Sequence, residues 1–288
     1  MQDTAGSGWN RDRVVEAILS AGKTALDHFH QPAISMKHDM TIVTEADREI
    51  EEGLAKRFAR PDEGVYFIGE ETIADRGEEY LDDAFAGRAF IVDPIDGTVP
   101  FAHGFPTWGI SVGYAEDGFF REGALFLPTS GQLLVTEGDT VYYGRLGPIP
   151  VDWDADRMVP FHLPEEIDVS HGVVSVSQDV TKRGGFSGKE SVHASGSAVF
   201  ALTHLALGAL AGYIASVKVW DIAGGWPIIE RLGFHIAFED GSPATGLSIA
   251  DAFNLSADSK RRWRAKSRLF VARNSEYVAD LRKRTDLG

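Results

Sequence analysis

One stretch, residues 89–98, constrains the fold of this chain more than any other. It reads Ala-Phe-Ile-Val-Asp-Pro-Ile-Asp-Gly-Thr, so apolar residues suited to a buried strand are followed directly by two carboxylates. Pro94 has no N–H and cannot continue a central strand, which predicts a turn where the carboxylates begin. Asp93 and Asp96 are then expected to point to one place across that turn. The glycine and threonine that follow would let the backbone approach a ligand closely and would add a hydroxyl.

This pattern has two interpretations. Hard cations such as Mg²⁺ take oxygen ligands, typically one or two carboxylates together with substrate phosphate and water, so the stretch fits a cation site that also holds a phosphate. Aspartate, proline and glycine are also common in ordinary turns, because aspartate bonds its own backbone and glycine supplies a positive φ. The stretch alone does not separate a metal site from a plain turn.

Charge and composition narrow the class of protein. The 288 residues include 43 acidic and 28 basic side chains, a formal net charge of −15, which repels nucleic acid and anionic membranes. Neither kind of partner is therefore expected, and no run approaches the roughly 18 apolar residues of a membrane span. The chain has no cysteine, which excludes disulfides and thiol nucleophiles and fits a cytoplasmic protein.

Carboxylates also follow two more predicted strands. Glu70 and Glu71 come after an apolar run at 65–68, and Asp221 comes after another at 212–219. Acids at the end of a buried strand are poorly placed to pack and well placed to bind a cation. A solvated loop is the alternative explanation at each place.

Two predicted helices begin with groups that could serve as caps or as ligands. Thr44 and Asp47 open one helix in a capping-box pattern, and the helix dipole favours a carboxylate in that first turn. Gly196 and Ser197 precede an apolar helix whose free N–H groups could receive a phosphate. Taken alone, these stretches favour the capping role at both helices.

The remaining pattern predicts a mixed order of helices and strands. Apolar periodicity indicates helices at 11–30, from 44 to the proline at 61, 197–210, 222–232 and 275–284. Short apolar runs indicate strands at 65–68, 108–115, 122–127, 132–136, 140–143, 172–177, 212–219, 234–238 and 268–272, with a hairpin turn at 117–118. Residues 178–189 are expected to form a polar loop.

A proline-rich connection at 144–168 predicts two halves. The N-terminal half, 1–146, would carry most of the metal site, and the C-terminal half, 147–288, would complete the metal and substrate site. Together they are expected to form one compact catalytic unit.

The predicted carboxylates would meet at one edge if their strands shared one sheet. Such a cluster would repel itself, so we expect one to three divalent cations to compensate it. No Cys/His set has the spacing of a zinc site, and oxygen ligands favour Mg²⁺ or Mn²⁺. Paired metals can position a water nucleophile and stabilise the leaving oxygen of phosphoryl transfer.

Three motifs carry a resemblance to a known family. They are Gly-Glu-Glu at 69–71, Asp-Pro-Ile-Asp-Gly-Thr at 93–98 and Trp-Asp-Ile-Ala-Gly at 220–224. In this order and spacing they resemble the inositol monophosphatase family of Mg²⁺-dependent, lithium-sensitive phosphatases. The segments 43–47 and 101–106 also match its pattern, and the resemblance covers roughly residues 11–240.

The resemblance implies a ligand set for the metals. Glu70, Asp93 and the carbonyl of Ile95 would hold the first metal. Asp93, Asp96 and Asp221 would hold the second. Glu70 would also act in catalysis by reaching a third metal through water.

The resemblance also implies catalytic and substrate-binding groups. Thr98 and Asp47 would orient the attacking water and help to deprotonate it. The residues assigned to the substrate are Gly97, Thr98, Gly196, Ser197 and Asp221. The implied fold is α+β, a layered α-β-α-β-α sandwich with two mainly antiparallel sheets, and the implied assembly is a homodimer.

The chain departs from the family pattern where inositol-selective members contact substrate hydroxyls. The segment 210–215 has no acid, and Ile214 cannot accept a hydrogen bond through its side chain. The metal-binding motifs themselves are complete. We expect a Mg²⁺-dependent phosphomonoesterase that hydrolyses a small phosphorylated metabolite, inositol-phosphate-like or a sugar phosphate, by metal-activated water.

Several alternatives stay open at this point. Within the family, the substrate could be histidinol phosphate, fructose 1,6-bisphosphate or 3′-phosphoadenosine 5′-phosphate. The chain could also be a non-catalytic member that binds a protein partner, or a structural protein that only binds cations.

Overall fold

The structure is a computed structural model that describes residues 8–36, 42–147, 157–163 and 172–286. Its helices are α1 (Arg11–Phe29), α2 (Glu45–Phe58), α3 (Glu78–Ala86), α4 (Thr98–Ala102), α5 (Gln178–Arg183), α6 (Ala198–Ala206), α7 (Val219–Ala223), α8 (Trp226–Arg231), α9 (Ile249–Ala252) and α10 (Ser275–Arg284). The larger sheet is built from β3 (Val65–Gly69), β4 (Arg88–Asp96), β5 (Gly109–Glu116), β6 (Phe119–Leu127), β7 (Gln132–Glu137), β8 (Thr140–Arg145) and β9 (Val159–Pro160). The second sheet is built from β10 (Val173–Val176), β12 (Ser191–His193), β13 (Gly212–Ala215), β14 (His235–Phe238) and β15 (Leu269–Ala272).

The two sheets differ in strand direction. The seven-stranded sheet has the order β3-β4-β5-β6-β7-β8-β9, and its neighbouring strands run antiparallel except for the parallel pair β3 and β4. The five-stranded sheet has the order β12-β10-β13-β15-β14, with β10 parallel to both of its neighbours and β15 antiparallel to both of its own. Two small ribbons, β1 (Ile34–Met36) with β2 (Ile42–Thr44) and β11 (Gly185–Phe186) with β16 (Thr285–Asp286), lie outside these sheets.

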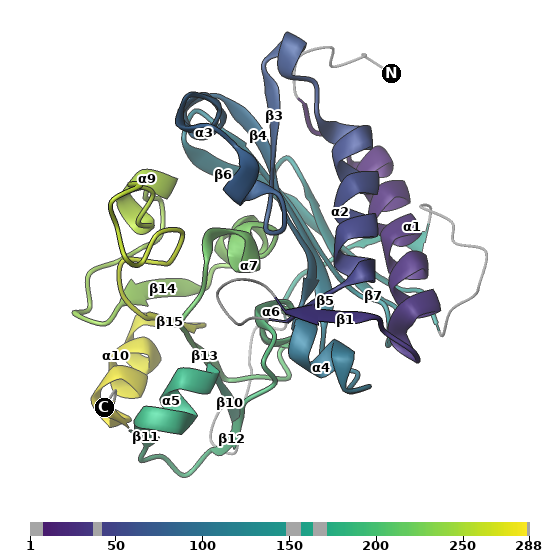
Figure 1. The fold of residues 1–288 in the computed structure, drawn as a ribbon. Coiled ribbons are helices and arrows are strands. Elements are labelled where there is room, and N and C mark those ends of the chain that lie inside the picture. Colours follow the sequence, from purple (N-terminus) through teal and green to yellow (C-terminus); the bar gives the residue numbers. More distant parts are fainter. Residues whose placement is uncertain (1–7, 37–41, 148–156, 164–171, 287–288) are drawn as a thin grey trace.

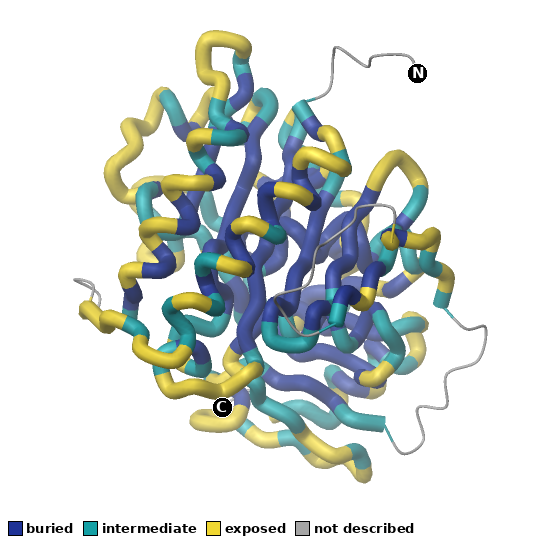
Figure 2. The backbone as a smooth tube through the Cα atoms, turned by 90° about the vertical axis from the view of Figure 1, so that its right-hand side faces the viewer, coloured by how far each residue is buried: buried dark blue, intermediate teal, exposed yellow. Residues whose placement is uncertain are grey.

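Helices cover both sheets and fill the space between them, which gives five layers (Figure 1). α1 and α2 pack on one face of the seven-stranded sheet, in a cluster that includes Ile18, Leu54 and Phe90. α6, α7 and α8 lie between the sheets, and α5 and α10 cover the outer face of the five-stranded sheet. The buried strands run through the middle of the molecule and the exposed residues lie outside (Figure 2). The predicted α-β-α-β-α sandwich is confirmed, but only the seven-stranded sheet is mainly antiparallel, since the five-stranded sheet has two parallel and two antiparallel pairs.

The first two helices begin where the sequence predicts. The Asn10 side chain accepts a hydrogen bond from the backbone N–H of Arg13 and caps α1. Thr44 and Asp47 form a capping box at α2, because each side chain bonds the backbone N–H of the other. Both caps satisfy N–H groups that a helix start would otherwise leave without partners.

The turn predicted at Pro94 is wrong, because β4 continues to Asp96. Between Asp93 and Asp96 the pairing with β5 shifts, from Ser111 to Gly109, so three steps along β4 match two along β5. A β-bulge of this kind is one of the few places where proline is accepted inside a sheet. In a regular strand, residues three apart face opposite sides, and the extra residue brings both carboxylates to one side.

Two other local predictions differ from the structure, and one short helix was not predicted. The polar loop expected at 178–189 contains the helix α5 and the strand β11. The helix expected at 222–232 is two short helices, α7 and α8, separated by Gly224 and Gly225. The helix α4 was not predicted, because its five residues give no periodic pattern.

The predicted connection between the halves is partly described. Residues 148–156 and 164–171 lie outside the described part of the chain. β9, at 159–160, pairs with β8 and so extends the N-terminal sheet past residue 146. The apolar cluster between the sheets contains residues of both halves, such as Ile91 and Leu202. The boundary at 146 stays a prediction.

Candidate active site

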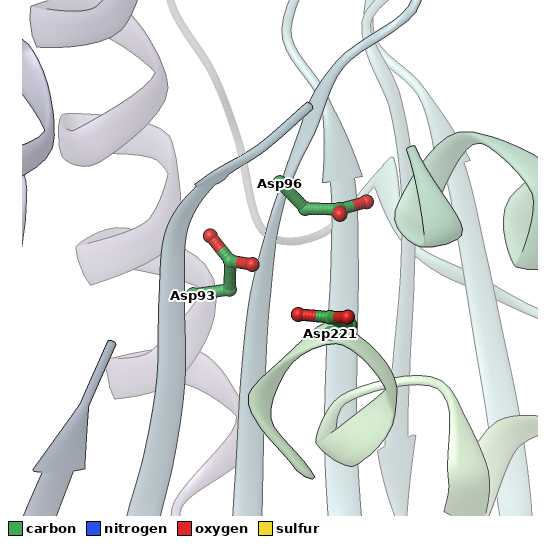
Figure 3. A group of neighbouring side chains, drawn as sticks. All are labelled: Asp93, Asp96 and Asp221. Carbon is green, nitrogen blue, oxygen red and sulfur yellow. The ribbon is translucent and has the colours of Figure 1, made fainter. Parts of the chain in front are cut away.

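Three aspartates form the centre of the candidate site. Carboxylate oxygens of Asp93, Asp96 and Asp221 all lie within 4.8 Å of one another. Asp93 and Asp96 come from the end of β4, and Asp221 comes from α7 on the opposite side of the shared space (Figure 3). We call these three residues the carboxylate cluster. The predicted convergence of these acids is therefore confirmed.

The acids meet at a junction of two sheets, and not at the edge of one. β3 runs parallel to β4, so Glu70 follows the end of β3 next to Val92, and its N–H donates to the Val92 carbonyl at 3.2 Å. The strand before Asp221 is β13, which belongs to the five-stranded sheet. The condition that all these strands share one sheet is not met, and the acids converge because α7 carries Asp221 across from the second sheet.

Close packing fixes α7, and therefore Asp221, against the larger sheet. A Cβ atom on Gly123 of β6 would lie 2.1 Å from the carbonyl oxygen of Gly224, and one on Gly113 of β5 would lie 2.6 Å from Ala223. The Ser111 hydroxyl donates to the Trp220 carbonyl at 3.0 Å and accepts from the Gly224 N–H at 3.1 Å. These contacts hold both ends of the short segment that contains Asp221.

Burial and mutual repulsion raise the pKa of all three carboxyl groups in the cluster. For Asp93, burial and then the negative charge of Glu70 raise the pKa well above the ordinary range. For Asp96 the causes are burial and the charge of Asp221. Burial and Glu70 raise the pKa of Asp221 to about 6. A positive charge placed among these groups would relieve both effects.

Ser197 and Val199 orient the side chain of Asp96. The Ser197 hydroxyl donates to Asp96 Oδ2 at 2.6 Å, and the N–H of Val199 donates to the same oxygen at 2.5 Å. Ser197 also caps α6 by accepting from the Phe200 N–H. The capping interpretation of Ser197 is confirmed, while its assignment to the substrate stays a prediction.

Glu70 makes an ion pair that the sequence did not indicate. The ammonium of Lys218 lies 2.9 Å from Glu70 Oε1. Burial opposes the charge on this lysine, but Glu70 and Asp221 together raise its pKa. The Lys218 N–H also donates to Asp221 at 2.8 Å. Lys218 therefore places a positive charge at the edge of the carboxylate cluster.

Asp47 is buried at the start of α2 and is only 1% exposed. Its Oδ2 accepts from the Thr44 N–H at 2.7 Å and from the Thr44 hydroxyl at 2.6 Å. Burial raises the pKa of Asp47 to about 7, although the bonds from Thr44 oppose that change. Its charge also contributes to the raised pKa of Asp93, which indicates that the two carboxyl groups lie near each other.

The loop after β4 has the conformation that only glycine adopts easily. Gly97 has a φ of 94°, and a Cβ there would lie 3.0 Å from the Ser197 Cβ. The Ile95 N–H donates to Asp93 Oδ1 at 3.1 Å, and the Ile95 carbonyl accepts from the Thr98 hydroxyl at 3.2 Å. These bonds fold the loop back on the cluster and bring Thr98 beside it.

The carboxylate cluster lines a cavity of about 900 Å³, which we call the main cavity. Most of the predicted site residues line it, namely Glu70, Asp93, Ile95, Asp96, Gly97, Thr98, Gly196 and Asp221. Ile214 is not among the lining residues, because β13 lies in the middle of its sheet and this side chain packs in the apolar cluster of Val176 and Phe270. A side chain at position 214 is therefore directed into this apolar cluster and not into the main cavity.

The residues of the cluster fit a hard divalent cation. All three offer carboxylate oxygens, which are the ligands that Mg²⁺ and Mn²⁺ prefer. Oxygens on opposite sides of Mg²⁺ are about 4.2 Å apart, close to the 4.8 Å within which these atoms lie. Burial and the negative charges of neighbouring carboxyl groups raise the pKa of Asp93 and Asp96, and a divalent cation would offset both effects.

Comparison with known proteins decides the family. A sequence profile described as the inositol monophosphatase family matches residues 11–274. The chain belongs to this family.

Two similar proteins are named as phosphatases. A histidinol-phosphatase from Chlorobaculum parvum is 33% identical over 150 residues, 50% of this chain and 53% of that protein. An inositol-1-monophosphatase from Mesorhizobium japonicum is 27% identical over 238 residues, 79% of this chain and 85% of that protein. The structure of an IMPase from Thermotoga maritima has a TM-score of 0.69 at 21% identity, covers 94% of this chain and 96% of that chain, and confirms the fold.

A buried acid outside the family motifs, Glu51, positions the segment 69–71. Glu51 is 1% exposed, and its carboxylate accepts from the N–H groups of Glu71 at 2.8 Å and Thr72 at 2.9 Å. Burial raises the pKa of Glu51 to about 7. The available signal was its place on the buried face of α2, four residues after Asp47, since a charged side chain there needs partners.

Replacing Glu51 with glutamine should lower the free energy of unfolding by about 1–2 kcal/mol, since the amide NH₂ cannot accept one of these two bonds. The expected change is measured by urea unfolding. Glu52→Gln, on the exposed side of the same helix, is the matched control and should change stability by less than about 0.5 kcal/mol. Equal effects of the two variants would contradict a positioning role for Glu51.

Proposed function

We propose that this protein is a divalent-cation-dependent phosphomonoesterase acting on a small phosphorylated metabolite. The observation that supports this most is the carboxylate cluster of Asp93, Asp96 and Asp221 in the wall of the main cavity. Membership of the inositol monophosphatase family and the names of its relatives support the same activity.

The metal ligands of the proposal are Glu70, Asp93, the Ile95 carbonyl, Asp96 and Asp221. Bound there, divalent cations would acidify a water molecule and stabilise negative charge on the phosphate and on the leaving oxygen. Mg²⁺ is the proposed cofactor, with two or three ions in each site, and Mn²⁺ is the proposed substitute. Glu70 has to exchange its bond to Lys218 for a cation ligand in this scheme.

The remaining residues of the proposal handle the water and the phosphate. Thr98 orients the attacking water, and Asp47 takes up its proton, a task suited to a carboxyl group whose pKa is about 7. The water oxygen bonds to phosphorus as the bond between phosphorus and the ester oxygen breaks, and the leaving oxygen takes a proton from solvent. The N–H groups of Gly97 and Thr98 bind the phosphate, with Gly196, Ser197 and Asp221 completing the substrate site.

Three further assignments belong to this proposal. The proposed homodimer is supported by the family resemblance. The proposed cytoplasmic location is supported by the absence of cysteine. A small metabolite, and not nucleic acid, is supported by the net charge of −15. In the described part of the chain, no helix has both the length and the apolar character needed to cross a membrane.

The direct test is phosphate release from a panel of esters, first with Mg²⁺ and then with EDTA. The panel holds inositol 1-phosphate, histidinol phosphate, fructose 1,6-bisphosphate, 3′-phosphoadenosine 5′-phosphate and glycerol 2-phosphate. We expect Mg²⁺-dependent release from at least one ester and none in EDTA. Folded protein that releases phosphate from no ester would favour a non-catalytic, protein-binding member of the family.

A further inference from the structure

A second cavity of about 650 Å³ lies beside the main cavity, and its lining is basic. Its charged lining residues are the cations Lys182, Arg183, Arg261, Arg264 and Arg268 and the carboxylates Asp179 and Glu239. This excess of positive charge occurs in a chain whose net charge is −15. We call this cavity the basic pocket.

Both carboxylates of the basic pocket are bound by the same arginine. Arg268 Nε lies 2.9 Å from Asp179 Oδ2, and Arg268 Nη1 lies 3.7 Å from Glu239 Oε2. The other four cations form no ion pair with any residue that the structure describes. Their charges are therefore free to meet an anion from solution, where guanidinium and ammonium groups bind phosphate and carboxylate well.

The basic pocket and the main cavity share part of their walls. Gln178, Lys182 and Arg264 line both. Arg264 lines the main cavity together with Asp221 of the carboxylate cluster. A molecule with a phosphate at the cluster can therefore reach the basic pocket with its other end.

The start of α5, which carries Gln178 and Lys182, is held in place. The Ser177 hydroxyl donates to Asp179 at 2.5 Å and accepts from the Ser216 N–H at 3.2 Å. The Gln178 side chain donates to the Ala194 carbonyl at 3.0 Å. These bonds tie the shared wall to the end of β13 and to the chain after β12.

The backbone at Arg264 is fixed to the segment that leads into the cluster. The Val219 N–H donates to the Trp263 carbonyl at 2.8 Å, and the Ala265 N–H donates to the Val217 carbonyl at 3.0 Å. The residue between these two bonds, Arg264, is thereby placed opposite Lys218. The basic pocket is thus built from two anchored segments that are far apart in the sequence.

We propose that the basic pocket binds a second anionic group of the substrate, a phosphate or a carboxylate. The preferred substrates are then phosphate esters that carry a second negative group away from the phosphate that is removed. This inference rests on the proposed phosphatase function and narrows its substrate class.

Matched pairs of esters test the proposal. Fructose 1,6-bisphosphate is compared with fructose 1-phosphate, and 3-phosphoglycerate with glycerol 3-phosphate, so that the two pairs distinguish a second phosphate from a carboxylate. In at least one pair, we expect kcat/KM to be at least about tenfold higher for the doubly anionic ester. The double variant Lys182→Gln, Arg261→Gln should reduce that ratio about tenfold.

Lys260→Gln is the matched control, since Lys260 is exposed in the same segment and does not line the pocket. It should leave the ratio unchanged. Equal kcat/KM values within both pairs, or an equal change of the ratio in the control, would overturn the inference and leave the phosphatase function standing.

A binding measurement in Mg²⁺ keeps the inference testable if no ester is hydrolysed, because bound cations would let the carboxylate cluster hold the first phosphate while the basic pocket binds the second anionic group. By calorimetry, fructose 1,6-bisphosphate should bind more tightly than fructose 1-phosphate, and Lys182→Gln should weaken its binding about tenfold. Equal binding of the two sugars would overturn the inference. Absence of hydrolysis with this difference intact would overturn the phosphatase function alone.

Discussion

Replacement of Asp93 by asparagine should lower kcat roughly 10³-fold, the size of effect seen when one strong electrostatic contact to a transition state is removed. Asp93 is the residue that the proposal assigns to two metals, and the amide keeps its shape while losing its charge. The Ile95 N–H donates to Asp93 Oδ1, and the side-chain oxygen of asparagine can accept the same hydrogen bond, so the loop should keep its conformation. The change is measured as phosphate release at saturating Mg²⁺.

The loss of activity should occur without loss of folding. The charge of Asp93 is destabilising in the metal-free cluster, where burial and Glu70 raise its pKa. The metal-free variant should therefore unfold in urea at the same concentration as the parent protein or a higher one. Asp82→Asn, at an exposed position of α3, is the matched control and should keep full activity. An Asp93→Asn protein with near-normal turnover would refute the proposed role.

Addition of Mg²⁺ should stabilise the protein, and the gain should grow with pH. At a free concentration of 100 times Kd, a ligand that binds only the folded state adds about 2.7 kcal/mol to the free energy of unfolding. Metal binding requires ionised carboxylates, so protons compete with it. Thermal unfolding in Mg²⁺ and in EDTA, compared from pH 5 to pH 8, measures the gain.

The sign follows from the direction of the pKa shifts. Asp221 has a pKa of about 6 in the folded protein, above the ordinary value of 3.8. Its contribution to stability is fully present below pH 3.8 and is lost as the pH rises to about 6 in the metal-free protein. Mg²⁺ should reverse this loss. In Asp221→Asn the pH dependence of the Mg²⁺ gain should be smaller, and an unchanged dependence would contradict this explanation.

Local patterns in the sequence were sufficient to predict the separate parts of the site. A capping box depends on residues three apart, so Thr44 and Asp47 could be read directly, and the structure contains both of its bonds. The pattern of an apolar run that ends in an acid reflects the burial of a single segment, so it can also be identified from the local sequence. The positions of Glu70 and Asp93 at the ends of neighbouring strands follow from such runs.

Contacts between distant segments could not be predicted in this way. Nothing near Lys218 indicates that its ammonium meets Glu70, 148 residues away. Asp96 and Ser197 are separated by 101 residues, and only the packing of α6 against β5 and β6 brings them together. The acceptance of Pro94 inside β4 depended on the register of β5, which the sequence of β4 does not specify.

The sequence by itself determined the chemistry of this protein: which acids end apolar strands, which residues cap helices, and which family motifs occur. The tertiary structure decided where these groups act. It placed Asp221 opposite β4 through close contacts at Gly113 and Gly123, buried Ile214 away from the main cavity, and opened the basic pocket beside it. Side-chain type and local spacing are properties of a segment, whereas distance, burial and shifted pKa values arise only when segments pack together.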